Sequence, residues 1–249
     1  MAKRRSRLDS LLVERGLAAS RERARALILA GQVRVDGHVV SKAGTAIGDE
    51  ARIDLKVPDH PYVSRGGLKL AHALDAFAID PAGRRALDIG ASTGGFTDVL
   101  LQRGARDVVA IDVGHNQIDW RLRNDPRVTV REGVNARALT RSDVPHAVGV
   151  VTIDVSFISL TYILPALAPL VDPATDIVAL VKPQFEAGRG DIEKGGLVTD
   201  PAIHEQVIAR VSSAAEGLGF ERLGLVESPI RGGTGNKEFL MHLRLRPPR

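Results

Sequence analysis

The stretch Ala86-Leu87-Asp88-Ile89-Gly90-Ala91-Ser92-Thr93-Gly94-Gly95-Phe96-Thr97-Asp98-Val99-Leu100-Leu101 decides the fold. A short apolar run ends in an acid and a glycine, passes through a loop of small residues and leaves through a segment that begins a helix. This order of strand, tight turn and helix N-terminus is how an open α/β sheet holds a nucleotide-like ligand at the carboxyl ends of its strands. The glycines suit a backbone that turns sharply and approaches a ligand closely.

The glycine spacing excludes two common nucleotide sites. The loop reads D-x-G-x-x-x-G-G, so it contains neither the G-x-G-x-x-G of dinucleotide-binding proteins nor the G-x-x-x-x-G-K-[S/T] that holds a triphosphate. A second apolar run, 108–111, ends in Asp112, and an acid about 20 residues beyond such a loop suits a pair of ribose hydroxyls. These features favour S-adenosylmethionine over NAD or ATP. The alternative is a plain strand-to-helix connection.

Length and composition describe a globular chain. Its 249 residues, 44% of them hydrophobic, suffice for one full α/β domain and a small second one. The longest apolar stretch, 160–171, is broken by Pro165 and Pro169 and is too short to span a membrane. The sequence after the basic N-terminus does not show a signal-peptide pattern, because the apolar run 11–13 is interrupted at once by Glu14 and Arg15. Because there is no cysteine, disulfides, a thiolate nucleophile and a Cys-type metal site are excluded, and we expect a cytoplasmic protein with no metal and no membrane partner.

The positive charge is concentrated near the N-terminus. Residues 1–60 contain twelve Lys/Arg and eight Asp/Glu, whereas the remainder contains 22 of each. Within residues 1–34, nine basic residues face three acidic ones. This asymmetry predicts a polyanionic partner for the N-terminal part and a neutral, cofactor-using C-terminal part.

The basic segment has a clear local pattern. Apolar residues at helical spacing over 8–12 stop at Gly16, and Ser20 begins a second helix that Gly31 ends. Two valine-rich strands then flank Asp36-Gly37, a strong hairpin signal, and residues 51–55 supply a third strand.

Two short helices followed by a Val-Arg-Val-Asp-Gly hairpin resemble the small RNA-binding module of the ribosomal protein S-four type, over about residues 6–56. The resemblance implies that basic side chains of this module contact RNA phosphates. The candidates are Arg7, Arg21, Arg25 and Lys42. The alternative is that these side chains are merely solvated.

The chain is predicted to divide into an RNA-binding domain (1–57), a proline-containing linker (58–63) and a catalytic domain (64–249). Within the catalytic domain we expect a helix over 70–77, parallel strands at 86–89, 108–111, 128–130, 148–153 and 177–181, helices at 160–170 and 201–218, and a closing antiparallel pair at 222–226 and 238–245. The continuous β-branched runs indicate strands buried on both faces.

Charged residues stand where four of these strands end: Asp88, Asp112, Asp154 and Lys182. Any one of them could be an ordinary surface charge, but together they mark the ligand-facing edge of such a sheet. Lys182 lies between Val181 and Pro183, where desolvation favours the neutral amine and hence a role as a base.

The catalytic part resembles the FtsJ-type ribose 2′-O-methyltransferases, and the whole chain resembles the TlyA family of rRNA cytidine 2′-O-methyltransferases. The matching stretches are 63–70 (VSRGGLKL), 88–96 (DIGASTGGF), 154–160 (DVSFISL) and 181–186 (VKPQFE). The resemblance implies an α/β, Rossmann-like S-adenosylmethionine-dependent methyltransferase fold, a mostly parallel sheet with helices on both faces, preceded by a small α+β RNA-binding domain. It also implies ribosomal RNA or a ribosomal subunit as partner. The oligomeric state stays open.

The resemblance also assigns site residues. The Lys-Asp-Lys-Glu tetrad corresponds to Lys69, Asp154, Lys182 and Glu238. Arg65 is a further candidate for RNA contact. Cofactor contacts are expected from Asp88, Gly90, Ala91, Ser92, Thr93, Gly94, Gly95, Phe96, Asp112, Val113, Asn135 and Asp154. Asn135 is preferred to Glu132 beside the adenine. Thr93-Gly94-Gly95-Phe96 replaces the family's Pro-Gly-Gly-Trp, which leaves the aromatic contact in question.

In this interpretation Lys182 takes the proton of the ribose hydroxyl, Lys69 stabilises the developing alkoxide, and the two acids orient the amines. Nearby carboxylates favour a charged lysine, so which lysine is the base stays open. Two alternatives compete with this interpretation. In one, Lys182 only anchors an RNA-closing loop at 187–196. In the other, the tetrad is a buried ion-pair network that carries out no chemistry.

Three other classes of protein compete with an rRNA methyltransferase. An inactive methyltransferase fold could serve as a ribosome-assembly factor, but all four tetrad residues are present. A small-molecule methyltransferase would not need the basic module. Some family members carry a haemolysin label, yet the sequence has neither a membrane span nor an aromatic-anchored amphipathic helix.

Overall fold

The computed structural model describes residues 5–18, 20–56, 60–144 and 147–247. The chain divides into two compact units, Met1–Pro61 and Tyr62–Arg249, and each has its own hydrophobic core. Residues 57–59 of the predicted linker lie outside the described residues.

The N-terminal unit is an α+β module. Its elements are β1 (Arg5–Arg7), α1 (Leu8–Glu14), α2 (Arg21–Leu29), β2 (Val33–Val35), β3 (His38–Val39), β4 (Ala46–Gly48) and β5 (Ile53–Leu55). Ser20 caps α2 as predicted, because its hydroxyl accepts a hydrogen bond from the Arg23 amide at 3.1 Å. Asp36 and Gly37 both have positive φ, at 49° and 83°, as the tight hairpin turn requires. The short antiparallel pair of β1 with β4 was not predicted.

The second unit is built on one seven-stranded sheet with the order β11-β12-β10-β9-β6-β7-β8. Its strands are β6 (Arg85–Ile89), β7 (Asp107–Asp112), β8 (Val128–Glu132), β9 (Val148–Ile153), β10 (Asp176–Val181), β11 (Phe220–Glu227) and β12 (Phe239–Leu245). Strands β6 to β10 pair in parallel, whereas β12 runs antiparallel to both of its neighbours, β10 and β11. This is the predicted mostly parallel sheet with a closing antiparallel pair.

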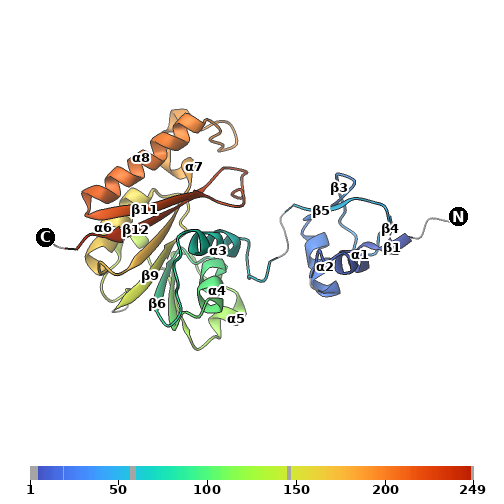
Figure 1. The fold of residues 1–249 in the computed structure, drawn as a ribbon, viewed down its shortest axis with the longest axis horizontal. Coiled ribbons are helices and arrows are strands. Elements are labelled where there is room, and N and C mark those ends of the chain that lie inside the picture. Colours follow the sequence, from blue (N-terminus) through green and yellow to red (C-terminus); the bar gives the residue numbers. More distant parts are fainter. Residues whose placement is uncertain (1–4, 19, 57–59, 145–146, 248–249) are drawn as a thin grey trace. The chain divides into compact units, whose positions relative to one another are not determined.

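Helices cover both faces of this sheet, as Figure 1 shows. Leucines and other apolar residues of α3 (Gly66–Ala76), α4 (Gly95–Gln102) and α5 (Trp120–Arg123) pack in one core cluster, whereas α6 (Leu164–Leu167) and α8 (Pro201–Gly217) contribute to the other. Successive residues of β10 from Ile177 to Val181 alternate between the two clusters, and all six residues of the strand are buried. The expectation of strands buried on both faces is therefore confirmed for β10. It is wrong for β8, an edge strand whose residues are only half-buried or exposed.

The predicted helix over 160–170 is also wrong in detail. The segment forms a 3-10 turn (Leu160–Tyr162), the single turn of α6 and a second 3-10 turn (Ala168–Leu170). Pro165 and Pro169 each stand in the first turn of a new piece, because proline lacks the N–H that a continuing helix needs.

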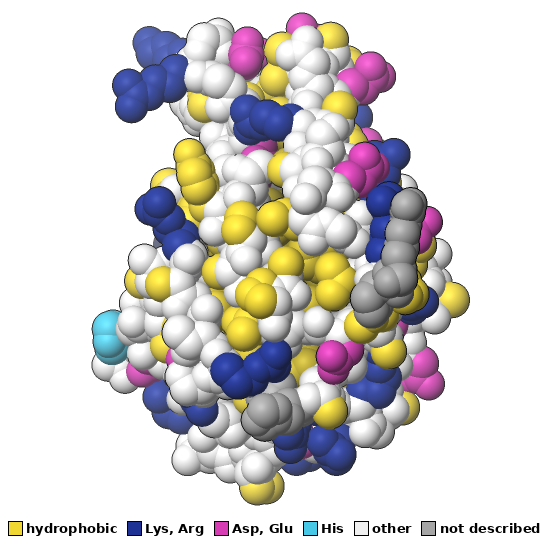
Figure 2. Space-filling view, turned by 90° about the vertical axis from the view of Figure 1, so that its left-hand side faces the viewer, with side chains coloured by type: hydrophobic (Ala, Val, Ile, Leu, Met, Phe, Trp, Pro, Cys, Tyr) yellow, Lys and Arg dark blue, Asp and Glu magenta, His cyan; other side chains and the backbone are white. Residues whose placement is uncertain are grey.

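Charges of both signs are interspersed on the face drawn in Figure 2, where basic and acidic side chains surround a central area of exposed apolar atoms. No single-signed patch covers that face. Among the described residues, no helix has the length and apolar character needed to cross a membrane.

Candidate active site

The strand order reverses between β6 and β9, and two adjoining cavities open at the carboxyl ends of these strands. We call them the apolar cavity, of about 470 Å³, and the lysine cavity, of about 280 Å³. They share four lining residues: Gly90, Ser92, Asp154 and Ser156. A ligand in one cavity can therefore reach a ligand in the other across these residues.

The apolar cavity has aliphatic walls and a few polar groups. Its other lining residues include Ile89, Ile111, Asp112, Val113, Gln117, Val134, Asn135, Val155, Phe157 and Ile158. The Asn135 side-chain oxygen accepts a hydrogen bond from the Arg137 amide at 3.0 Å, which fixes the orientation of the Asn135 amide group. Glu132, the alternative to Asn135, does not line the cavity and is engaged by Arg123 and the Asn116 amide.

The glycine loop joins this cavity to the lysine cavity. Gly90 has φ of +84°, and a Cβ at this position would overlap the carbonyl oxygen of Asp154 and lie 2.8 Å from its carbonyl carbon. Only glycine permits that contact. The Asp112 carboxylate then holds the loop and its own turn, accepting hydrogen bonds from the amides of Ser92 and Gly114, both at 2.7 Å.

Asp88 lies beneath the loop rather than in it. Its carboxylate is fully buried and accepts hydrogen bonds from the hydroxyls of Thr97, at 2.7 Å, and Thr152, at 2.9 Å. Burial raises the pKa of Asp88 to about 6, and the nearby charge of Asp154 acts in the same direction. Because Asp88 lines neither cavity, its geometry is that of a support for the loop and not of a ligand contact.

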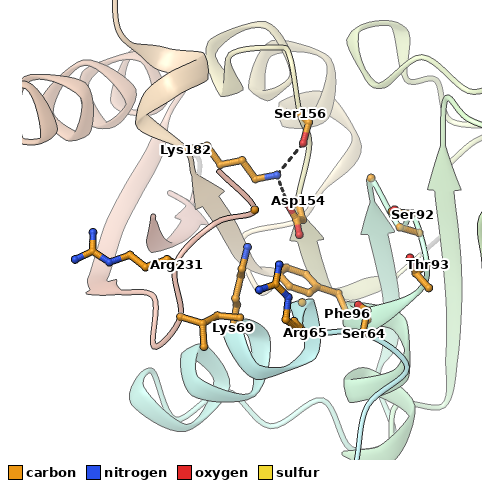
Figure 3. A pocket seen from close by; sticks show the side chains of 16 residues that line it. Ser64, Arg65, Lys69, Ser92, Thr93, Phe96, Asp154, Ser156, Lys182 and Arg231 are labelled. Atoms are coloured by element: carbon orange, nitrogen blue, oxygen red, sulfur yellow. Dashed lines mark hydrogen bonds and ion pairs between the residues drawn. The ribbon is translucent and has the colours of Figure 1, made fainter. Parts of the chain in front are cut away.

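Two lysine–acid pairs dominate the lysine cavity. The Lys182 ammonium lies 2.6 Å from Asp154 Oδ1 and donates a hydrogen bond to Ser156 Oγ at 3.0 Å. Lys69, on α3, pairs with Glu238 Oε2 at 2.5 Å. In Figure 3 both lysines extend into the same cavity, Lys182 from the end of β10 and Lys69 from the helix below. Both lysines are at least nine-tenths buried, so these charges have little water to screen them.

The loop between β11 and β12 carries Glu238 and is itself braced. Asn236 is buried; its oxygen accepts a hydrogen bond from the Val198 amide at 2.8 Å, and its NH2 group donates to the Gly196 carbonyl at 2.8 Å. The glycine-rich 187–196 segment is thus tied to this loop at its end. Arg231, on the same loop, lines the lysine cavity.

Glu186 links the segments that carry Asp154 and Lys182. Its carboxylate accepts hydrogen bonds from the Ser159 hydroxyl at 2.6 Å and the Leu160 amide at 2.7 Å. Burial raises the pKa of Glu186 above its ordinary value. The contact fixes the 154–160 segment against the 182–186 segment.

Most residues expected at the site line one of the two cavities. Ala91, Thr93, Gly95, Phe96, Arg65, Lys69 and Lys182 line the lysine cavity, and Asp112, Val113 and Asn135 line the apolar cavity. Gly94 lies outside both, with Leu122 against it, and Glu238 lies buried behind Lys69. The sequence reasoning missed Ser64, Ser156, Phe157 and Arg231. Ser156 could have been found, because it stands two residues after Asp154, on the same side of an extended chain.

The N-terminal candidates gather in the other unit. Arg7, Arg21 and Arg25 all contact the carboxylate of Asp9, which the sequence reasoning did not single out. Lys42 is exposed in the turn that follows β3. Among the described residues, no group of three or more His, Asp and Glu side chains is arranged to hold a metal ion.

The apolar cavity fits S-adenosylmethionine. Its aliphatic walls suit an adenine ring, the Asp112 carboxylate suits a ribose diol, and the Gly90 turn leaves backbone space that a side chain would fill. The fold and the two cavities therefore define a Rossmann-like methyltransferase of the S-adenosylmethionine-dependent class. A methyltransferase of this class from Mesorhizobium loti shares the fold, with a TM-score of 0.51 at 15% identity, over 70% of this chain and 96% of that one.

Closer relatives share both units. The FtsJ-like methyltransferase family model matches residues 62–245, and the S4 domain model matches residues 6–53. The 16S/23S rRNA (cytidine-2'-O)-methyltransferase TlyA of Mycobacterium tuberculosis is 49% identical over 99% of this chain and 92% of its own length. Hemolysin A of Brachyspira hyodysenteriae is 42% identical, over 95% of this chain and 98% of that protein. A solved structure from Streptococcus thermophilus, also titled as a hemolysin, has a TM-score of 0.77 at 46% identity and covers 99% of this chain and 91% of its own.

The chain belongs to the TlyA family, in which an S4 domain precedes an FtsJ-like methyltransferase domain.

Proposed function

We propose that this protein is an S-adenosylmethionine-dependent 2′-O-methyltransferase that acts on the ribose of a cytidine in ribosomal RNA. The observation that carries the proposal is the pair of buried lysine–acid contacts in a cavity that shares Gly90, Ser92, Asp154 and Ser156 with a cavity suited to the cofactor. The substrate assignment is supported by the relative from Mycobacterium tuberculosis, whose name specifies 16S/23S rRNA and cytidine-2'-O.

We assign the cofactor to the apolar cavity. Asp112 would hold the ribose hydroxyls, Asn135 and Val113 would flank the adenine, and the 90–96 loop would lie against the remainder of the molecule. When bound, S-adenosylmethionine supplies an electrophilic methyl group. Asp154 stands where the two cavities meet, so its charge also favours a cationic ligand there.

Within the lysine cavity we assign the chemistry to this chain's own side chains. A ribose hydroxyl is a very weak acid, so it needs a base as its oxygen attacks. Lys182 would accept that proton on Nζ in its neutral form, with Asp154 and Ser156 fixing the direction of the amine. Lys69, held by Glu238, would stay charged and stabilise the oxygen as negative charge develops on it.

RNA binding would be shared between the two units. Arg7, Arg21, Arg25 and Lys42 would contact phosphates from the N-terminal unit, and Arg65 would do so at the mouth of the lysine cavity. In this scheme residues 58–63 connect an RNA-binding domain, 1–57, to the catalytic domain, 64–249. A ribosomal RNA substrate also implies action in the cytoplasm and no membrane partner.

Single-turnover methylation by Lys182→Ala tests the proposal. A positioned base is worth ~10²–10⁴ in rate, so methylation should fall by that factor while cofactor and RNA affinities stay near wild type. Lys182→Ala combined with Glu238→Ala should be scarcely slower, because residues that act as one unit are not additive. Lys237→Ala is the matched control, since Lys237 lies beside Glu238 in the sequence but pairs at the surface with Glu227.

The pH–rate profile distinguishes a base from an anchor. A base at Lys182 predicts a rate that rises with pH through one ionisation that the alanine variant lacks. If Lys182 instead anchors the 187–196 segment, the variant should bind RNA weakly and keep the wild-type profile. That second result would overturn the assignment of Lys182 as the base.

A further inference from the structure

Asp9 is a fully buried acid that contacts three arginines of the N-terminal unit. Arg7 donates to it twice, from Nε to Oδ1 at 3.0 Å and from Nη2 to Oδ2 at 2.9 Å. Arg25 Nε lies 3.2 Å, and Arg21 Nη2 3.4 Å, from the same Oδ2. One carboxylate therefore contacts Arg7, which directly precedes α1, and Arg21 and Arg25, which lie one turn apart on α2.

Three arginines around one carboxylate are more than Asp9 needs to balance its charge. A single arginine neutralises the charge of a carboxylate, and Arg7 already does so with a bidentate pair. Bringing Arg21 and Arg25 to the same point adds repulsion between like charges, which lowers stability when such residues are four apart on a helix. The cluster thus keeps a net positive charge that folding alone does not require.

The three guanidiniums remain accessible while the acid does not. The arginine side chains are 51–54% exposed, and the Asp9 side chain is 0% exposed. A guanidinium has five N–H donors, and each arginine gives Asp9 only one or two of them. By contrast, the nearby Arg15 donates to the carbonyls of Asp49 and Ala51 and so braces the backbone.

The neighbouring turn belongs to the same arrangement. The amides of Leu8 and Asp9 donate to the carbonyls of Thr45 and Ala43, which fixes the turn that carries Lys42 against the start of α1. The turn also packs on Arg7, since a Cβ at Gly44 would lie 3.2 Å from Arg7 Nη1. Its backbone limits where that guanidinium can lie.

We propose that Asp9 is a positioning residue that holds Arg7, Arg21 and Arg25 together as one preorganised site for backbone phosphates of RNA. This inference rests on the proposed RNA-binding function of the N-terminal unit. A long side chain that must be ordered on binding costs roughly two- to tenfold in affinity, and Asp9 removes that cost for three of them in advance. The Arg7 guanidinium, followed by Arg25 and Arg21, holds the pKa of Asp9 well below its usual range, so the acid stays charged at any physiological pH.

The direction in which one substitution changes RNA affinity tests the proposal. Asp9→Asn removes a negative charge from an RNA-binding unit, so a simple charge effect would strengthen binding to a polyanion. Positioning predicts the opposite: affinity of the full chain for a fluorescently labelled RNA hairpin should fall by about tenfold or more. The dependence of log affinity on log salt should also become shallower, because fewer phosphates are neutralised.

Asp54→Asn is the matched control. It removes the same charge from the same unit, but Asp54 is partly exposed and pairs with the exposed Arg52, at 2.8 Å. The affinity of Asp54→Asn for the RNA hairpin should equal that of the wild type or rise slightly. If Asp9→Asn binds the hairpin as well as Asp54→Asn does, with the same salt slope, the proposal is wrong.

Two further measurements keep the test decisive. Arg21→Gln with Arg25→Gln should weaken RNA binding; if it does not, the proposed RNA-binding role itself fails, whatever Asp9 does. If Asp9→Asn does not fold, nuclear magnetic resonance of the wild type replaces it. The Nε–H protons of Arg7 and Arg25 should exchange with water far more slowly in the RNA-free protein than that of Arg52, whose Nε donates to Asp54 in a surface pair with an 80% exposed arginine side chain. Equal exchange rates would overturn the proposal.

Discussion

Asp88 carries a buried carboxylate whose charge should cost the folded protein stability at neutral pH. Its pKa is raised by burial from 3.8 to about 6. Between about pH 4 and pH 6, Asp88 binds a proton in the folded state that it releases in the unfolded state. The contribution of Asp88 to the free energy of unfolding is therefore greatest below about pH 4 and is lost as pH rises through about 6. The shift of roughly two units corresponds to about 3 kcal/mol at 1.36 kcal/mol per unit.

Asp88→Asn removes this titration and keeps the shape and most of the hydrogen bonding with Thr97 and Thr152. The quantity to measure is the free energy of unfolding in urea for wild type and variant, at several values from about pH 4.5 to about pH 7.5. The difference, variant minus wild type, should increase by about 2 kcal/mol over that range in favour of the variant. Taking the difference cancels the pH dependence of all other groups.

Asp75→Asn is the control, because Asp75 is 61% exposed and pairs with Arg103 on the surface. Its difference from wild type should stay flat over the same range. A flat difference for Asp88→Asn as well would mean that water or a rearrangement solvates the carboxylate, and the reasoning from burial would be refuted.

Two further expectations concern the cavities. Asp112→Ala should weaken S-adenosylmethionine binding by roughly 1.5–3 kcal/mol through loss of charge-assisted ribose contacts, and unchanged affinity by calorimetry would contradict the assignment. Gly232→Ala should slow single-turnover methylation without changing cofactor affinity, because the new Cβ would overlap Glu238 Oε1 and lie 3.0 Å from Cδ, displacing the acid from Lys69. Gly217→Ala, at the end of α8, adds the same carbon where nothing lies within 4 Å and lines neither cavity, so this variant should methylate normally; equal rates for both variants would remove this role for Glu238.

The central sheet could be predicted because each of its strands follows from a short run of neighbouring residues. Residues 148–153 and 177–181 are continuous apolar runs, and each was expected within one residue of its observed bounds. The 160–170 segment failed because helical periodicity was given more weight than its two prolines. The pairing of β1 with β4 could not be predicted from the sequence, since each strand has three residues and its partner lies about forty residues away.

The same limit applies to the candidate site. Asp88 and Asp112 both follow apolar runs, yet one is fully buried under the loop and the other faces the apolar cavity. Strand periodicity alone cannot separate them, because the depth of a residue depends on what packs above it. The contact of Arg7, Arg21 and Arg25 with Asp9 joins parts of the chain that only the packing of α1 against α2 brings together.

Glu238 shows how topology completes the site. Parallel strands bring their carboxyl ends to one edge, which explains Asp154 and Lys182, at the ends of β9 and β10, but Glu238 precedes its strand. Strand β12 runs antiparallel to β10 in a register that opposes Phe239 to Val181, so the start of β12 lies at the edge where β10 ends. The acid that follows the last glycine-rich loop therefore meets Lys69, 169 positions earlier in the chain. Because this pair depends on the pairing of β12, a variant that weakens that pairing should lose the Lys69–Glu238 contact before the Lys182–Asp154 contact, which spans two adjacent parallel strands.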